Sequence, residues 1–256
     1  MCKIDYNSYR SVKGFNRRIR FIVMHYTAAD FFSSVKLLAG DGGVSAHYLV
    51  PDPTEKNYIN SGFKDMRIFN LVDESDRAWH AGISHWQGRS SLNDTSIGIE
   101  IVNLAKYEHG EFIFPPFKQE QIEAVKTLAL NIIQRYPDIS PINVIGHSDI
   151  AVGRKSDPGP LFPWFELYQF GVGAWYDDET KDKYLIQFHK EGIPIQKDII
   201  SKMNAYGYDI SNANTNDGYQ KLVRAFQLHF RQKNYDGRMD NETAAILYSL
   251  VDKYIH

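Results

Sequence analysis

The run Ile19-Arg20-Phe21-Ile22-Val23-Met24 predicts a β-strand with two buried faces, because it is apolar at nearly every position. This sets the strongest limit on the fold, since such a strand needs a sheet that is covered on both sides. Weaker β character recurs over 46–50, 68–72, 97–102 and 143–146. The pattern predicts an α/β or α+β fold built around a buried sheet.

Residues 119–135 change to a helical period. Apolar side chains recur there at every third or fourth position, which is typical of an amphipathic helix packed on a sheet: Ile122, Val125, Leu128, Ala129, Ile132 and Ile133. Pro137 limits this helix at its carboxyl end. The spacing therefore predicts one helix that covers the sheet.

The composition changes again near residue 176. We interpret residues 1–176 as one domain, with its core at about 15–175, and the charged stretch 177–196 as a linker. Residues 197–256 predict a small domain of three helices, at roughly 197–206, 218–232 and 241–254. The chain is thus expected to hold an α/β domain followed by a helical one.

The charge balance argues against a nucleic-acid partner. Lys and Arg number 29 and Asp and Glu number 31, a formal net charge of −2, whereas phosphate binding needs a clustered excess of basic residues. The longest apolar runs fall far short of the roughly 18 to 20 residues that a membrane span requires, and no signal peptide is recognisable. We therefore expect neither nucleic-acid binding nor a membrane span.

Cys2 is the only cysteine, which excludes an intrachain disulfide and a Cys-rich metal site. Any metal must then be held by His and carboxylate side chains. Two interpretations of Cys2 stay open. It is an incidental thiol near a frayed terminus, which is the commoner case, or the acylated cysteine of a lipoprotein, which would anchor the chain to a membrane.

Two histidines directly follow predicted strands: His25 after the first apolar run, and His147 after residues 143–146. Asp157 follows ten residues after His147, in a turn-rich loop, 156–160. Two neutral imidazoles and one carboxylate are a ligand set that leaves a catalytic zinc ion one open position. The spacing leaves open whether the three side chains meet, or whether each histidine is only a hydrogen-bonded structural residue.

Glu100 lies in Ile97-Gly98-Ile99-Glu100-Ile101-Val102, where alternation places it on the face opposite the isoleucines, next to Gly98. An ionised carboxylate on that face must meet a cation, a metal-bound water or solvent. It is therefore either a general acid–base group beside a metal or an edge residue that faces water. Lys155 precedes Asp157 by two positions, so it lies either at the same cleft or on the open surface.

Several sequence blocks, in order over about residues 15–175, resemble zinc-dependent N-acetylmuramoyl-L-alanine amidases: 23–27, 44–50, 78–82, 92–100, 146–150 and 154–160. The resemblance implies a mixed β-sheet flanked by helices, and one zinc ion per chain held by His25, His147 and Asp157. Glu100 and Lys155 match the family's catalytic positions, the first as proton carrier and the second beside the developing oxyanion. Residues 223–227, 236–237 and Thr243 are similar to the three-helix peptidoglycan-binding module that follows some of these amidases.

The remaining aromatic and histidine residues are weaker candidates. Tyr48, Trp79 and Trp86 have the chemistry to stack on sugar or on aliphatic carbons, although core packing is the usual role of such residues. His80 either lines the cleft beside Trp79 or braces its loop, and His47 is expected to pack in the sheet. We expect surface positions for His85, His109, His189, His229 and His256.

The resemblance implies hydrolysis of the amide between the lactyl group of N-acetylmuramic acid and L-alanine, in peptidoglycan or in muropeptides. Two other functions stay open: a recognition module that binds muropeptides without cleavage, and a zinc peptidase that cuts within the stem peptide. The C-terminal module either binds glycan or only caps the first domain. A monomer in the bacterial periplasm or cell envelope is expected, as an outer-membrane lipoprotein if Cys2 is acylated, and a cytoplasmic recycling role stays an alternative.

Overall fold

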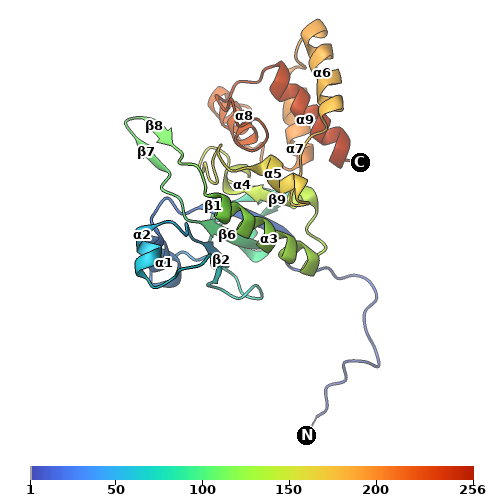
Figure 1. Cartoon of the computed structure of the whole chain (residues 1–256). Helices are drawn as coiled ribbons and strands as arrows, with labels where there is room; N and C mark the ends of the chain where they lie inside the picture. Colours follow the sequence, from blue (N-terminus) through green and yellow to red (C-terminus); the bar gives the residue numbers. More distant parts are fainter. Residues whose placement is uncertain (1) are drawn as a thin grey trace.

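A computed structural model describes residues 2–256 and contains a central five-stranded sheet in the order β3-β2-β6-β1-β9 (Figure 1). Its strands are β1 (Phe21–Tyr26), β2 (Tyr48–Val50), β3 (Phe69–Asn70), β6 (Ser96–Ile101) and β9 (Val144–Gly146). The pairs β1–β6, β1–β9 and β2–β6 are parallel, and β2–β3 is antiparallel. The sheet is therefore mixed, which confirms the predicted fold class, although the outer strands are shorter than predicted.

The sheet register brings three candidate site residues to one edge. His25 in β1 lies opposite Glu100 in β6, and Met24 lies opposite Gly146, the residue before His147. Because the carboxyl ends of parallel strands share one edge of a sheet, the side chains of His25, Glu100 and His147 lie close together at that edge.

Helices cover the sheet. Helix α3 (Gln119–Arg135) lies along it (Figure 1) and buries the predicted apolar positions except for the half-buried Ile133, which confirms the helix over 119–135. Helices α1 (Phe31–Ala39) and α2 (Lys56–Asn60) enclose a second apolar cluster beside β2. The other elements before residue 177 are β4 (His85–Trp86), β5 (Arg89–Ser90), β7 (Lys106–Glu108), β8 (Glu111–Ile113), α4 (His147–Ile150), α5 (Trp164–Gln169) and two 3-10 turns, Leu92–Asp94 and Pro141–Asn143.

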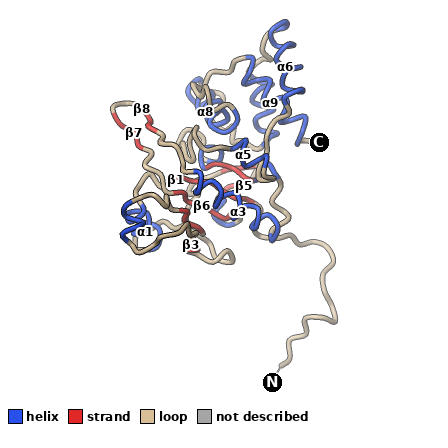
Figure 2. Tube along the Cα trace, viewed as in Figure 1, coloured by secondary structure: helices blue, strands red, loops and turns tan. Residues whose placement is uncertain are grey.

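The C-terminal part is wholly helical, as Figure 2 shows. It contains α6 (Asp178–Glu191), α7 (Gln196–Tyr206), α8 (Asn216–Phe230) and α9 (Asn241–Tyr254), and the last three confirm the predicted helices. The expected linker over 177–196 is instead mostly occupied by α6, which buries only Phe188. It packs against α9 through Tyr184 and Phe188, whose rings contact Tyr248, while Asp177 caps its start and exposed ion pairs such as Lys183–Glu179 add to its stability.

One continuous apolar core joins the two parts, since residues of the sheet, α3 and α7 to α9 belong to the same cluster. Trp86 lies in this shared core, 1% exposed, with its Nε1 donating to the carbonyl of Ile142 and its ring against Tyr206 and Tyr208. Of the two roles considered for Trp86, the structure therefore supports core packing rather than stacking on substrate. The division into domains at residue 176 stays a prediction.

Before β1, the described residues from 2 onward form an extended segment that leaves the folded body (Figure 2). Cys2 is exposed in this segment, with a free thiol. Among residues 2–256, no helix combines the length and the apolar character needed to span a bilayer.

Candidate metal centre

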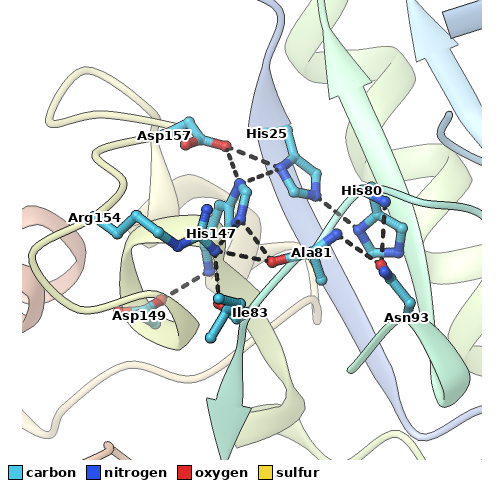
Figure 3. A network of polar contacts seen from close by, with 10 residues as sticks. His25, His80, Ala81, Ile83, Asn93, His147, Asp149, Arg154 and Asp157 are labelled. Carbon is cyan, nitrogen blue, oxygen red and sulfur yellow. Dashed lines mark hydrogen bonds and ion pairs between the residues drawn. The ribbon is translucent and has the colours of Figure 1, made fainter. Parts of the chain in front are cut away.

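Three ligand atoms from distant parts of the chain converge at the sheet edge (Figure 3). His25 Nδ1 lies 3.0 Å from His147 Nδ1 and 2.9 Å from Asp157 Oδ2, and His147 Nδ1 lies 3.0 Å from Asp157 Oδ2. All three side chains are buried. The structure thus brings together the three residues that the sequence analysis predicts as candidate metal ligands.

The separations suit a small divalent cation. Ligand atoms at about 2.0 to 2.1 Å from a tetrahedral zinc ion lie about 3.3 Å from one another. The observed 2.9 to 3.0 Å is close to this spacing. A nitrogen, nitrogen and oxygen donor set with a fourth side facing a cleft is typical of a catalytic zinc site.

Hydrogen bonds fix both histidine tautomers for metal binding. The Nε2 of His147 lies 3.1 Å from the carbonyl of Ala81, which can only accept, so Nε2 carries the proton and Nδ1 keeps its lone pair. On the other side, the Ser96 hydroxyl donates to the carbonyl of Leu92 and therefore accepts from His80 Nε2. His80 Nδ1 is then left to accept from His25 Nε2, at 3.0 Å.

This relay leaves the Nδ1 lone pair of His25 directed at the ligand cluster. His80 thus holds the His25 ring in place through the Nε2 hydrogen bond, and it also lines the cleft. Gly98 makes this arrangement fit, because a Cβ atom there would lie 2.4 Å from the His80 ring.

The charge states agree with the tautomers. Burial lowers the pKa of His25 to about 4 and that of His80 well below its ordinary value, so both are neutral at pH 7. Burial alone would raise the pKa of Asp157, but the neighbouring His147 and His25 side chains hold it well below its usual value. Asp157 is therefore anionic at pH 7, beside the neutral imidazole of His25.

Glu100 lies beside this cluster on β6. Its Oε2 atom is buried and has no hydrogen-bond partner among the described residues. Burial and the neighbouring Asp157 raise the pKa of Glu100 well above its ordinary value, while Lys155 opposes the shift. A carboxyl group with a pKa raised in this way is suited to general acid–base catalysis.

A cleft of about 550 Å³ opens above the ligands. Lys155 is exposed and lines it together with Glu100, His147 and Asp157. Trp79 forms part of its rim, with 57% of its surface exposed and the Arg77 guanidinium 4.7 Å from its ring. The size matches that of pockets that enclose small organic ligands.

Tyr48 lies away from this cleft lining. Its hydroxyl donates to Glu74 at 2.7 Å, and Glu74 also binds the Arg135 guanidinium of α3. The side chain thus ties β2 to a loop and to a helix, and we no longer count it among the substrate-binding candidates.

Sequence reasoning missed several supporting residues. Asn93 Oδ1 accepts from the backbone amides of His80 and Ala81, and Arg154 Nη2 donates to the carbonyls of Ala81 and Ile83, so both fix the loop that holds the site (Figure 3). Both residues belong to the motif blocks, but the sequence does not show their partners, because these are backbone amides and carbonyls of a distant loop.

His229 was expected on the surface and is instead buried, with its Nδ1 2.8 Å from Asp149 Oδ2. The expectation was wrong because His229 lies between the buried apolar residues Leu228 and Phe230 of α8, where its ring stacks on Trp164. His47 is buried in the sheet and accepts from the Gly98 amide, as expected.

A buried two-histidine, one-aspartate cluster beside an acid, at the edge of a mixed sheet, defines the class of a metal-dependent hydrolase. The family Amidase_2, described as N-acetylmuramoyl-L-alanine amidase, matches residues 15–160. The AmiD amidase of Escherichia coli K12 is 45% identical over 239 residues, 93% of this chain and 84% of that protein. The chain therefore belongs to the N-acetylmuramoyl-L-alanine amidase family, and it is an enzyme, as the sequence resemblance predicts.

Solved structures agree over the whole chain. AmpDh3 from Pseudomonas aeruginosa in complex with anhydromuramic pentapeptide is 57% identical, with a TM-score of 0.97 and 100% coverage of both chains. E. coli AmiD in complex with its substrate anhydro-N-acetylmuramic acid-L-Ala-D-gamma-Glu-L-Lys is 42% identical, with a TM-score of 0.85 and 98% and 97% coverage. The likeness includes the C-terminal helices, so the two-part architecture is shared.

Proposed function

We propose that this chain hydrolyses the amide between the lactyl group of N-acetylmuramic acid and L-alanine, with one zinc ion held by His25, His147 and Asp157. The observation that carries the proposal is the convergence of three buried ligand atoms on one point of the cleft, in tautomers suited to a metal. Zinc bound there would supply Lewis-acid polarisation of the scissile carbonyl and lower the pKa of water toward about 7.

Glu100 is the proposed proton carrier. Its unpartnered Oε2 atom takes a proton from the attacking water while the new carbon–oxygen bond forms. The same oxygen then gives this proton to the nitrogen of L-alanine as the carbon–nitrogen bond breaks. The products are a lactyl carboxylic acid and a free amine, which become carboxylate and ammonium when the acid passes its proton to the amine, so the glutamate ends as it began.

Lys155 is the proposed electrostatic partner. The scissile carbonyl oxygen gains negative charge on the way to the transition state, and a positive side chain in the same cleft stabilises that charge. Its position between the metal ligands and the open surface lets the ammonium group reach a bound substrate.

Muropeptides are the proposed substrates, because two related amidases have been solved with anhydromuramyl peptides bound. Trp79 offers an exposed aromatic face at the cleft rim for a sugar or for aliphatic carbons of the stem peptide. His80 we assign to support of His25 rather than to substrate contact.

The test is to measure the zinc content of the purified chain and to identify by mass spectrometry the products formed from a muropeptide. We expect one zinc per chain, together with a free stem peptide that begins with L-alanine. Zinc-free protein that binds muropeptide without amine release would support a recognition module. A muramyl product that retains L-alanine would identify a peptidase.

We also propose that the chain acts as a monomer in the bacterial periplasm or cell envelope, where cross-linked peptidoglycan lies. Anchoring through an acylated Cys2 is the accompanying hypothesis, supported only by the exposure of this thiol on an extended segment. Fractionation of cells that produce the chain, with mass analysis of its N-terminal peptide, tests both location and acylation. Recovery in the cytoplasm with an unmodified thiol would contradict them.

A further inference from the structure

The C-terminal helices contact two of the three chain segments that carry metal ligands, the helix α4 and the loop of Asp157. In α8, His229 Nδ1 donates to Asp149 Oδ2 at 2.8 Å. The Tyr208 hydroxyl, just beyond α7, donates to Asp149 Oδ1 at 2.7 Å. Asp149 lies in α4, the short helix that begins with the ligand His147.

Asp149 is completely buried, and its carboxyl group connects the C-terminal helices to the backbone of the site. Besides its two bonds from the C-terminal part, it accepts at 2.8 Å from the amide of Gly146, the residue before His147. Removing any one of these donors would leave a buried carboxyl oxygen short of a partner, which is costly in a protein interior.

Helix α4 has only four residues, which is too short to be stable by its own hydrogen bonds. Its orientation must therefore come from contacts with its surroundings. The Ser148 amide donates to the carbonyl of Asp157 at 2.8 Å, so α4 also supports the loop of a second ligand. Displacement of this helix would move two of the three ligands together.

A second contact from α8 reaches the loop of Asp157 directly. Arg224 Nη1 donates to Ser156 Oγ at 3.3 Å, one residue before that ligand. His229 itself is held in place by Trp164 of α5, since their rings stack with centroids 3.8 Å apart. The donors that face α4 are thus fixed by packing as well as by hydrogen bonds.

We propose that Asp149, His229 and Tyr208 form an interdomain clamp that positions His147, so that the C-terminal helices set the affinity of the metal centre. This inference rests on the proposed metal-dependent function. It assigns to the helical part a role beyond glycan binding or capping. Hydrogen-bond partners outside the ligand shell commonly change metal affinity by about 10 to 100-fold when they are removed.

Zinc affinity in the full chain tests the clamp, measured by competition with a chromophoric chelator. His229→Leu removes the donor to Asp149, Tyr208→Phe deletes one hydroxyl, and His229→Asn keeps a side-chain N–H near the Nδ1 position. We expect zinc binding to weaken by about 10 to 100-fold in His229→Leu, and by less in Tyr208→Phe. His229→Asn should recover most of the loss.

Ser249→Ala is the matched control. It removes a buried hydrogen-bonding hydroxyl that contacts the backbone of Asp177, within the C-terminal part and away from α4. This variant is expected to lower the melting temperature while leaving zinc affinity unchanged, which separates positioning from general stability. If His229→Leu does not fold, Tyr208→Phe carries the test, because it opens no large cavity.

Wild-type zinc affinity in both Tyr208→Phe and His229→Leu would overturn the clamp. An equal loss of affinity in Ser249→Ala would overturn it too, since the effect would then follow stability alone. A wild-type chain that binds no zinc would instead refute the proposed metal centre, so the two failures are distinguishable.

Discussion

At the scale of single residues, the site depends on where protons and lone pairs lie. Ser96 donates to a carbonyl and must accept from His80, which in turn accepts from His25, and so the first ligand presents Nδ1. The acceptor carbonyl of Ala81 does the same for His147. Both tautomers are thus set by a backbone carbonyl that can only accept, that of Leu92 for the relay and that of Ala81 for His147. Both Nδ1 lone pairs are therefore available to a cation before one binds.

Glu100→Gln tests the proton carrier. The amide has nearly the same size but cannot take a proton, so we expect at least about a 100-fold fall in kcat with zinc content unchanged. Steady-state assay of amine release and metal analysis of the same sample measure both. The control is Glu179→Gln on the exposed surface of α6, which should leave kcat as in the wild type. Wild-type turnover by Glu100→Gln would remove this residue from the mechanism.

Gly98→Ala tests the relay behind His25. The new Cβ atom would lie 2.4 Å from the His80 ring, so the imidazole must shift or the strand must move. We expect a loss of about 1 to 3 kcal/mol in the free energy of unfolding, as in other overpacked cores, together with weaker zinc binding. Denaturant unfolding and chelator competition measure the two effects. Unchanged stability and unchanged zinc affinity would show that His80 is not held as described.

At the scale of elements, the sequence predicted the helices and strands that have a regular apolar period. It missed the features that depend on contacts between residues far apart in the chain. Helix α3 occupies the predicted range 119–135 because its stripe is continuous. The sequence predicted a linker at α6 because its apolar positions are few among many charged residues, and Tyr184 and Phe188 find their partner Tyr248 only in the distant α9. The burial of His229 could not be predicted, since its partner Asp149 lies 80 residues away.

The candidate site was likewise predictable where local sequence signals mark its residues, and not where distant contacts decide their role. His25, His147, Asp157 and Glu100 directly follow or lie within strong strand and loop signals, and the family resemblance supplied their grouping. Tyr48 was misjudged because its partners, Glu74 and Arg135, are distant in the sequence. An aromatic side chain gives no local sign of whether it packs, bonds or faces solvent.

The contacts of Glu74 with Tyr48 and Arg135 join a loop to β2 and α3, and they predict how the stability of this junction depends on pH. Burial raises the pKa of Glu74, but hydrogen bonds from Arg135 and Tyr48 outweigh it and hold the pKa below its ordinary value of 4.5. This contribution to stability is therefore complete above pH 4.5 and is lost as the pH falls through the lower, folded-state value. Glu74→Gln should cost about 1 to 2 kcal/mol at neutral pH, and less in acid.

Urea unfolding of wild type and Glu74→Gln at neutral and acidic pH measures this difference. Glu179→Gln, which removes an exposed helical ion pair, should change stability by under about 0.5 kcal/mol. A cost of Glu74→Gln that stays the same at both pH values would contradict the assigned role.

At the scale of the whole molecule, the shared core makes the two parts interdependent. Trp86 from the first part packs against Tyr206 and Tyr208 from the second. The apolar cluster continues from the sheet into α9 without a break. The C-terminal helices are therefore structural neighbours of the catalytic cleft rather than a tethered appendage.

The chain is accordingly expected to unfold in one cooperative transition, since neither part can expose its side of the core without cost. Calorimetry checks this through equality of the calorimetric and van't Hoff enthalpies. Added zinc should raise the midpoint, because a ligand that binds only the folded state stabilises it. Two separate transitions, with only the first shifted by zinc, would show that the parts are independent.

The central claim is that His25, His147 and Asp157 hold one zinc ion. Anomalous diffraction at the zinc absorption edge, from crystals grown with zinc, tests it most directly. The account predicts a single strong peak at about 2.0 to 2.2 Å from His25 Nδ1, His147 Nδ1 and Asp157 Oδ2. Absence of a peak among these atoms, or a peak held by other residues, would contradict it.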